Sequence, residues 1–480
     1  MTNSELIDLL DFVQTIKAET QTIELKAATG GCPSKLYDTL SSFSNQDDGG
    51  TIIFGIDEKN KFDETGVYDS QDLIKHVTEQ CNQMEPVVRP LFTTVTKGEK
   101  VFVSAEIPGM DVADRPCFYS GRGRIKGSYI RVGDADELMT EYEIYSYEAF
   151  RKKYQDDIRP VERATLATLN ADLLGRYMDR LKADRPNLAG LSDDKIYELM
   201  SITRNGVPTI TAVLLFSMYP QAYFPQLCIT AVAVPGKEIG DIGSEGERFL
   251  DNQRIEGTLP QMLDEAISFV KKNTRSKTIV DSTTGKRKDK PEYPVTAVRE
   301  VILNALVHRD YSMHTEGKPI QLNLFEDRME VQSPGGLYGR LSIDQLGKVQ
   351  PDTRNPVLAV AMEMLGETEN RYSGIPTIRK ELEQVGLPEP EFLDERGTFI
   401  VRFSNADINK DAEDECAAPK DLLQFCAIPR SRNEIASFLG IKTVSYAMKV
   451  YVKPLLDSKK LRPTNPEKPK SSNQRYVTIK

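Results

Sequence analysis

Hydrophobic and polar positions follow different periods in different parts of the chain. Residues 295–308, VTAVREVILNALVH, are apolar nearly all round, which predicts a buried helix. Helical spacing also marks residues 169–183 and 259–272, whereas continuous apolar runs at 211–218 and 227–234 predict strands. This mixture predicts an α/β (α+β) multidomain protein.

The N-terminal part repeats this mixture on a smaller scale. Residues 22–28 alternate as a strand, residues 35–45 have helical spacing, and residues 51–58, TIIFGIDE, read as a buried strand. We therefore expect a separate α/β domain over residues 1–150.

Length and composition limit the class of protein. At 480 residues the chain is too long for one core, and about three domains are expected. A mean hydropathy of -0.42 and 28% charged residues are typical of a folded, soluble protein. No apolar run approaches the roughly 20 residues that cross a bilayer, and the acidic N-terminus is unlike a signal peptide. We expect a cytoplasmic protein with no membrane partner.

Six scattered cysteines with no CxxC pair, and only three histidines, exclude a zinc finger and a disulfide framework.

Charge is unevenly distributed. The net charge is -10, yet the segment from Ile428 to the end of the chain holds twelve basic and only three acidic residues. This asymmetry suggests a basic C-terminal module with a polyanionic partner. We place an acidic linker at residues 405–420 and the basic module at residues 421–480.

The basic module has the pattern of a winged helix-turn-helix. Three helical stretches precede a Pro- and Lys-rich loop and an alternating strand, as in a β-wing. Protein contact or dimerisation is the alternative use of such a module. The residues expected to meet nucleic acid are Lys442, Ser445, Lys449, Lys453, Lys468 and Lys470.

The buried helix at residues 295–308 carries polar residues in line. Glu300, Asn304 and His308 are spaced i, i+4 and i+8, so they share one stripe. Burying such groups is costly without partners. A Glu followed by Asn at i+4 fits a Bergerat-type ATP site, in which Asn ligates a magnesium ion. The alternative is a helix end that faces solvent.

Glycine-containing motifs follow this helix in order. They are SPGGLYG at residues 333–339, RNP at 354–356 and RYSGIP at 371–376. Glycine after a strand permits close approach of a ligand, and a glycine at a helix start can present amides to phosphate. Taken singly, each is an ordinary turn.

The segments PVTAVREVILNALVHRDYS, FEDRMEVQSPGGL, TRNPVLA and SGIPTI together resemble the RecG-related C-terminal, ATPase-like domain of the GHKL (Bergerat) superfamily. The resemblance covers about residues 291–404 and leaves 151–290 as an α/β connecting segment. It implies ATP and Mg²⁺ as cofactors, with Glu300 activating water. Ser333 replaces the usual aspartate of the DxGxG box. The candidate nucleotide-binding residues are Asn304 as the metal ligand, His308, Ser333, Gly335, Gly336 and Gly374. No Walker A motif supports helicase activity.

The N-terminal motifs resemble the Schlafen/AlbA-type domain. ETQTIELKAA, SSFSNQDDGG and a strand ending at Asp57 match its pattern. The resemblance implies nucleic-acid binding and, as in Schlafens, cleavage by Glu19, Glu24 and Asp57 holding Mg²⁺ or Mn²⁺, with Lys26 assisting. The structural alternative is a Glu24–Lys26 pair on a solvated face.

A Gly-rich basic segment lies later in this domain. Arg122, Arg124, Lys126 and Arg131, with interleaved tyrosines, predict a hairpin that contacts phosphates and stacks on bases. A charged exposed hairpin without this role is the alternative.

Three functions follow from these patterns. The leading hypothesis is a nucleotide-responsive DNA-binding regulator, with a homo-oligomer expected by analogy to GHKL proteins. The second is a metal-dependent nuclease for RNA or DNA, with a role in antiviral defence. The third is a scaffold whose ATP site is vestigial.

Overall fold

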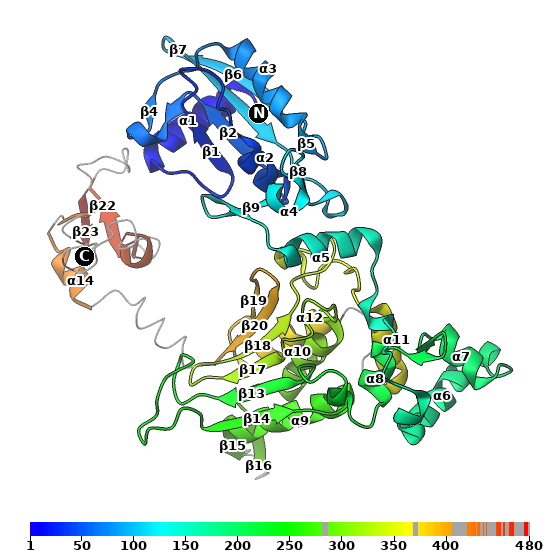
Figure 1. Ribbon diagram of the computed structural model, residues 1–480. Coiled ribbons are helices and arrows are strands. Elements are labelled where there is room, and N and C mark those ends of the chain that lie inside the picture. The colour runs from blue at the N-terminus through cyan, green and yellow to red at the C-terminus, as the bar shows by residue number, and fades with distance from the viewer. Residues whose placement is uncertain are drawn as a thin grey trace.

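The computed structural model shows a mixed α/β chain of several domains, as the hydrophobic pattern predicts (Figure 1). It describes residues 1–280, 287–367, 373–405, 420–428, 430–432, 435, 438, 448–452, 455–456, 460–464 and 475–478. Among the helices in these ranges, none has the length and apolar character needed to cross a membrane.

The N-terminal domain is built on a four-stranded sheet of order β1-β2-β7-β6. β1 and β2 are parallel, and the other neighbours are antiparallel. Its main elements are α1 (Asn3–Ile16), β1 (Ile23–Lys26), α2 (Tyr37–Ser44), β2 (Gly50–Phe54), α3 (Ser70–Cys81), β6 (Leu91–Lys97) and β7 (Lys100–Ile107).

The period of two in β2 explains why helices cover both faces of this sheet. Ile52 and Phe54 pack in one apolar cluster with α2 and α3, whereas Ile53 packs with Leu6 and Leu10 of α1. All five side chains are fully buried. Each such side chain contributes about 1.5–3 kcal/mol of transfer free energy.

The segment predicted as one basic hairpin has a different structure. Arg124 and Lys126 lie on a short helix, α4 (Gly123–Gly127), and the hairpin follows it as β9 (Tyr129–Val132) and β10 (Ala135–Leu138). The smaller strands of this domain are β3 (Ile56–Asp57), β4 (Asp63–Glu64), β5 (Met84–Glu85) and β8 (Phe118–Tyr119).

A six-stranded sheet of order β14-β13-β17-β18-β20-β19 forms the second domain. β13 and β17 are parallel, and the remaining pairs are antiparallel. The strands are β13 (Ile229–Ala233), β14 (Asp251–Ile255), β17 (Ile320–Leu324), β18 (Arg328–Pro334), β19 (Glu391–Asp394) and β20 (Thr398–Ser404). Strands on both sides of residue 290 therefore share one sheet and one core.

Helices α9 (Leu259–Asn273) and α10 (Val295–His308) pack against this sheet and against each other, and α12 (Gly374–Val385) packs against α10. The two predicted helices at 259–272 and 295–308 are confirmed. Between α9 and α10 lies a hairpin of β15 (Ser276–Val280) and β16 (Arg287–Pro291).

The apolar run at residues 211–218 was predicted as a strand, and this prediction is wrong. It forms α8 (Ile210–Phe216), which is buried on every side, so no amphipathic period distinguishes helix from strand. The Thr209 hydroxyl caps it by accepting from the Ala212 amide. Neighbouring elements are α6 (Ala171–Asp184), α7 (Asp193–Leu199), β11 (Thr203–Arg204), β12 (Val207–Pro208) and α11 (Pro356–Leu365).

Helix α5 (Glu141–Lys152) lies between the N-terminal domain and the six-stranded sheet (Figure 1). A Thr140–Glu143 capping box fixes its start. At the other end of the chain, α14 (Lys420–Phe425) precedes a three-stranded sheet of β21 (Arg430–Ser431), β23 (Arg475–Thr478) and β22 (Leu461–Pro463). The winged helix stays a prediction.

Candidate functional site

Helix α10 places its polar stripe in a cavity of about 520 Å³. Protein ligand sites typically have volumes of about 300–1,000 Å³. The cavity lies among α10, β18, the turn that follows β18 and the start of α12. Its lining includes every nucleotide-binding residue that the sequence singled out: Glu300, Asn304, His308, Ser333, Gly335, Gly336 and Gly374.

Glu300 and Asn304 meet the start of α12. The Asn304 side-chain amide donates to Glu300 Oε1 at 3.3 Å, which leaves the amide oxygen of Asn304 available to a cation. A Cβ at position 374 would collide with the Glu300 carboxylate, so a larger residue there would have to displace this side chain. The N-terminus of α12 carries unsatisfied amides and a positive dipole end, which suit a phosphate group.

Arg354 binds the turn after β18, which we call the glycine turn. Its Nη2 donates to the Gly336 carbonyl at 3.0 Å, and its Nη1 lies 3.8 Å from Asp310 Oδ2. Gly335 has φ +102°, and a Cβ there would strike Arg354 and Asp310. Glycine is therefore required at position 335 both by conformation and by space.

Arg354 was not among the predicted site residues, although its motif RNP was noted. Its guanidinium is buried, and its Nη1 has no hydrogen-bond partner in the described part of the chain. A signal was present in the sequence, because arginine is the only charged residue of that motif.

His308 is neutral in this cavity. Its side chain is exposed to the cavity, and the protein atoms that surround the cavity reduce the hydration of the ring. That desolvation, together with the positive charge of Arg354, lowers the pKa of His308 to about 4. The neutral imidazole keeps one acceptor nitrogen for a ligand donor.

Ser333 lies at the end of β18, where the resemblance placed an aspartate. Its hydroxyl donates to the Ala305 carbonyl at 3.2 Å, so it bonds to α10. A nearby carboxylate, Asp394, accepts from the Leu337 amide at 2.9 Å and does not line the cavity. Burial raises the pKa of Asp394.

In the N-terminal domain, Glu24 lies in a buried ion-pair group. Its Oε2 is 2.9 Å from Arg131 Nη2, and its Oε1 is paired with the ammonium of Lys26. Both predicted partners, Glu24 and Lys26, are therefore in contact, but Glu24 is buried and not on a solvated face.

Glu19 folds back towards Glu24 because the chain turns at Gln21 and Thr22, between the bridged residues Thr20 and Ile23. Glu19 Oε1 accepts from the Leu25 amide at 2.7 Å. Desolvation, followed by the charges of Glu24 and Glu58, raises the pKa of Glu19 to about 7.

Asp57 lies at the end of β3 and forms a local hydrogen bond. Its carboxylate caps a short 3₁₀ turn by accepting from the Lys59 amide at 3.1 Å. Within the ranges that the structure describes, no group of three or more His, Cys, Asp or Glu side chains is arranged to hold a metal ion.

The predicted basic residues separate into two kinds. Arg122 and Lys126 are exposed, and Arg124 is half-buried with its Nη1 3.6 Å from Glu148. Arg131 is 4% exposed and pairs with Glu24 and with Asp136 at 2.9 Å. Its placement on an exposed nucleic-acid surface is corrected: the two carboxylates hold its guanidinium inside the domain.

The residues predicted to contact nucleic acid in the C-terminal module are Lys442, Ser445, Lys449, Lys453, Lys468 and Lys470. Lys449 belongs to the short helix Met448–Val452, and its side chain, like the other five residues, lies outside what the structure describes.

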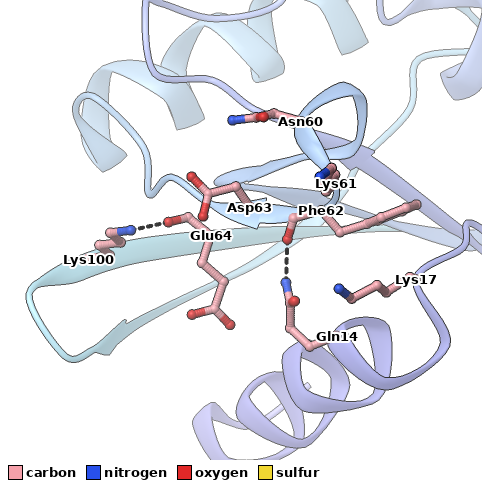
Figure 2. A pocket seen from close by; sticks show the side chains of 8 residues that line it. All are labelled: Gln14, Lys17, Asn60, Lys61, Phe62, Asp63, Glu64 and Lys100. Atoms are coloured by element: carbon pink, nitrogen blue, oxygen red, sulfur yellow. Dashed lines mark hydrogen bonds between the residues drawn. The ribbon is translucent and has the colours of Figure 1, made fainter.

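A second cavity, of about 660 Å³, opens in the N-terminal domain between α1 and the turn around β4 (Figure 2). Gln14 Nε2 donates to the Phe62 carbonyl at 2.7 Å, and the Lys100 ammonium donates to the Glu64 carbonyl. None of the predicted catalytic carboxylates lines it. Its acidic and basic side chains are mixed, so it has no clear preference for a charged ligand.

Two family models match parts of the chain. Residues 19–140 match the model described as "Schlafen, AlbA_2", and residues 317–403 match the model described as "Putative ATP-dependent DNA helicase recG C-terminal". The second match contains Ser333, Gly336 and Gly374 but begins after α10. The roles of Glu300 and Asn304 therefore depend on the cavity geometry.

Comparison with curated proteins found no match. Among solved structures, the chain is similar to the DIP2311 protein from Corynebacterium diphtheriae, with 19% identity, a TM-score of 0.39, and coverage of 95% of this chain and 93% of that chain. It is also similar to the N-terminal domain of a "Putative ATP-dependent DNA Helicase RecG-related Protein" from Nitrosomonas europaea. That similarity has 25% identity and a TM-score of 0.23, and it covers 28% of this chain and 94% of that chain.

The motifs quoted from the sequence and the two family models agree on the same two parts of the chain. The chain therefore combines a Schlafen/AlbA_2 domain at residues 19–140 with an ATPase-like domain of the recG C-terminal type at residues 317–403.

Proposed function

We propose that this protein binds ATP with Mg²⁺ in the α10 cavity and that the bound nucleotide controls its binding to DNA. The observation that carries this proposal is the convergence of the α10 stripe, the glycine turn after β18 and the start of α12 on one cavity. These segments are separated by about 25 to 75 residues in the chain, so their meeting is a tertiary feature and not a consequence of local sequence.

The donor set fits a magnesium nucleotide. The Asn304 amide oxygen would be a ligand to the metal, and the half-buried Glu300 would accept a hydrogen bond from a water beside it. A bound Mg²⁺ would neutralise phosphate charge. The backbone amides at the start of α12 would bind phosphate oxygens, and the apolar lining around Val331 would contact the base.

The N-terminal domain would supply the DNA contact. Its match to the Schlafen/AlbA_2 model and its exposed Arg122 and Lys126 support this assignment. The name of the other matched model refers to an ATP-dependent DNA helicase. Since the sequence has no Walker A motif, we propose control of DNA binding and not strand separation.

Calorimetry with ATP and Mg²⁺ tests the proposal. We expect Asn304→Ala to weaken binding by about tenfold or more, because a lost bond to a charged group costs roughly 1.5–3 kcal/mol. The matched control is Asn252→Ala, since Asn252 is exposed on β14 and does not line the cavity. No binding by the unmutated protein would contradict the proposal and favour a scaffold with a vestigial site.

A metal-dependent nuclease is the second candidate, and one observation favours it. The turn at Gln21 and Thr22 brings Glu19 close enough to Glu24 for their charges to interact. Incubation of the protein with labelled RNA and DNA in Mg²⁺ or Mn²⁺ tests this function. Cleavage that disappears in Glu19→Gln would establish the nuclease, whereas intact substrate would exclude it under these conditions.

A further inference from the structure

Helix α5 contacts the nucleotide cavity although it lies outside the sheet that forms the cavity. The Tyr142 hydroxyl donates to Asp310 Oδ2 at 2.8 Å, and the same Asp310 oxygen lies 3.8 Å from Arg354 Nη1. Asp310 is 4% exposed and its backbone amide donates to the Pro334 carbonyl at 2.8 Å. Tyr142 therefore contacts Asp310, which lies between Arg354 and the start of the glycine turn.

Further contacts of α5 reach the same turn. The Tyr142 ring lies against Gly397, whose carbonyl accepts from the Gly335 amide at 2.8 Å. Phe150 packs edge-on against Tyr338 with ring centroids 5.5 Å apart, and Tyr338 lines the cavity. A shift of α5 would have to move the turn or break these contacts, because packed groups do not deform continuously.

Another side of α5 contacts Arg124, which lies between the proposed DNA-binding residues Arg122 and Lys126 in the sequence. Glu148 of α5 lies 3.6 Å from Arg124 Nη1 and 2.6 Å from Lys152 Nζ. Arg124 lies on α4, beside the exposed Lys126. A DNA phosphate at Arg124 would compete with Glu148 for its guanidinium, since both are anions.

Two ion-pair groups hold the domains together around α5. Arg396 in the turn before β20 bonds Glu143 at 3.0 and 3.1 Å and Glu137 at 2.6 Å. Arg340, just after the glycine turn, bonds both carboxylate oxygens of Asp111 at 3.0 and 3.1 Å. The residue that follows the glycine turn thus contacts the N-terminal domain directly, in addition to the contacts through α5.

We propose that Tyr142, Asp310 and Arg354 are positioning residues for the nucleotide site and that α5 couples this site to DNA binding at Arg124. This inference rests on the proposed function, and it adds the route by which the two sites interact. Coupling requires that each ligand binds two arrangements of the same element with different affinities. It is reciprocal, so DNA changes ADP affinity by the factor by which ADP changes DNA affinity.

The test measures the dissociation constant of ADP by calorimetry, using the full chain with and without a saturating short DNA duplex of mixed sequence. We expect the two constants to differ by about fivefold or more in the unmutated protein. In Tyr142→Phe the ratio should fall to near one. Tyr145→Phe is the matched control, because Tyr145 lies on the same helix but donates to Asp156, at 2.9 Å.

A second variant, Glu148→Gln, tests the other end of α5 and keeps the test decisive if Tyr142→Phe folds poorly. We expect tighter DNA binding and a ratio closer to one, with ADP affinity in the absence of DNA unchanged. ADP and DNA binding with a ratio of one in the unmutated protein would overturn the coupling while leaving the proposed function intact. An unchanged ratio in both variants would also overturn it. No binding of ADP or of ATP with Mg²⁺ by the unmutated protein would overturn both proposals.

Discussion

Individual polar side chains show how burial changes the role of a residue. The sequence predicts functional roles for Glu24, as a catalytic carboxylate, and for Arg131, as a nucleic-acid contact. In the structure both side chains are buried, and they form an ion pair. Glu19, beside them, is half-buried, and its carboxyl lies near the acids Glu24 and Glu58. The ionised form of Glu19 is therefore disfavoured in the folded state.

This environment predicts a pH-dependent stability that Glu19→Gln should remove. The pKa of Glu19 rises from an ordinary 4.5 to about 7, first through desolvation. Between these values the folded protein holds the proton that the unfolded chain releases, so the contribution is fully present below pH 4.5 and is lost as pH rises through 7. Glutamine keeps the acceptor for the Leu25 amide without ionising.

Thermal melts across this pH range check the prediction. The melting temperature of Glu19→Gln should rise relative to the unmutated protein as pH increases from 4.5 to above 7. A constant difference between the two proteins would show that Glu19 ionises normally.

At the scale of elements, the β9–β10 hairpin is held to β1 by Arg131. Its guanidinium pairs with Glu24 of β1 and Asp136 of β10, and it also donates to the Thr20 carbonyl at 3.2 Å. Neighbouring α4 carries Lys126, which is exposed. Arg131 and Lys126 are thus five positions apart, but the first is buried in an ion-pair group and the second is exposed.

Urea denaturation and DNA binding should separate these roles. We expect Arg131→Ala to lower the free energy of unfolding by about 3–5 kcal/mol, because it leaves Glu24 and Asp136 without their buried cation. Lys126→Ala should change that free energy by less than about 0.5 kcal/mol, since it alters an exposed side chain. Equal stability of the two variants would contradict the burial of Arg131.

For the molecule as a whole, a net charge of -10 does not exclude a polyanionic partner, because charge is distributed unevenly. Exposed Arg122 and Lys126 lie on the N-terminal domain, which α5 connects to the nucleotide cavity. The two proposed binding sites are therefore at opposite ends of a continuous set of contacts.

The salt dependence of DNA binding should report the N-terminal contact. If Arg122 and Lys126 each meet one phosphate, the double variant Arg122→Ala/Lys126→Ala should reduce the slope of log affinity against log salt by about two, since each phosphate contact contributes about 0.9. Fluorescence anisotropy with a labelled duplex measures the slope. As a charge-matched control, Lys195→Ala/Lys271→Ala removes two exposed lysines on α7 and α9. An equal change in both variants would indicate a general charge effect.

Much of the local structure is determined by sequence alone. The nearly continuous apolar character of residues 295–308 identified α10 with the same bounds, Val295–His308, and helical spacing placed Glu300 and Asn304 on one stripe. These features depend on neighbours within two turns of helix, which the sequence displays directly. The prediction of a strand at residues 211–218, where α8 lies, failed because a segment that is buried on every side has no period that separates a helix from a strand.

Only the tertiary structure decided which distant groups meet. Arg131 is buried because Glu24, over a hundred positions away, supplies its counter-charge. Arg354 supports the glycine turn, and Tyr142 joins α5 to Asp310, through contacts that span up to 168 positions. Such pairings follow from how sheets and helices pack, and no local period encodes them. The sequence determined the α/β elements and the nucleotide-site motifs; tertiary packing decided that α5 would connect the two domains.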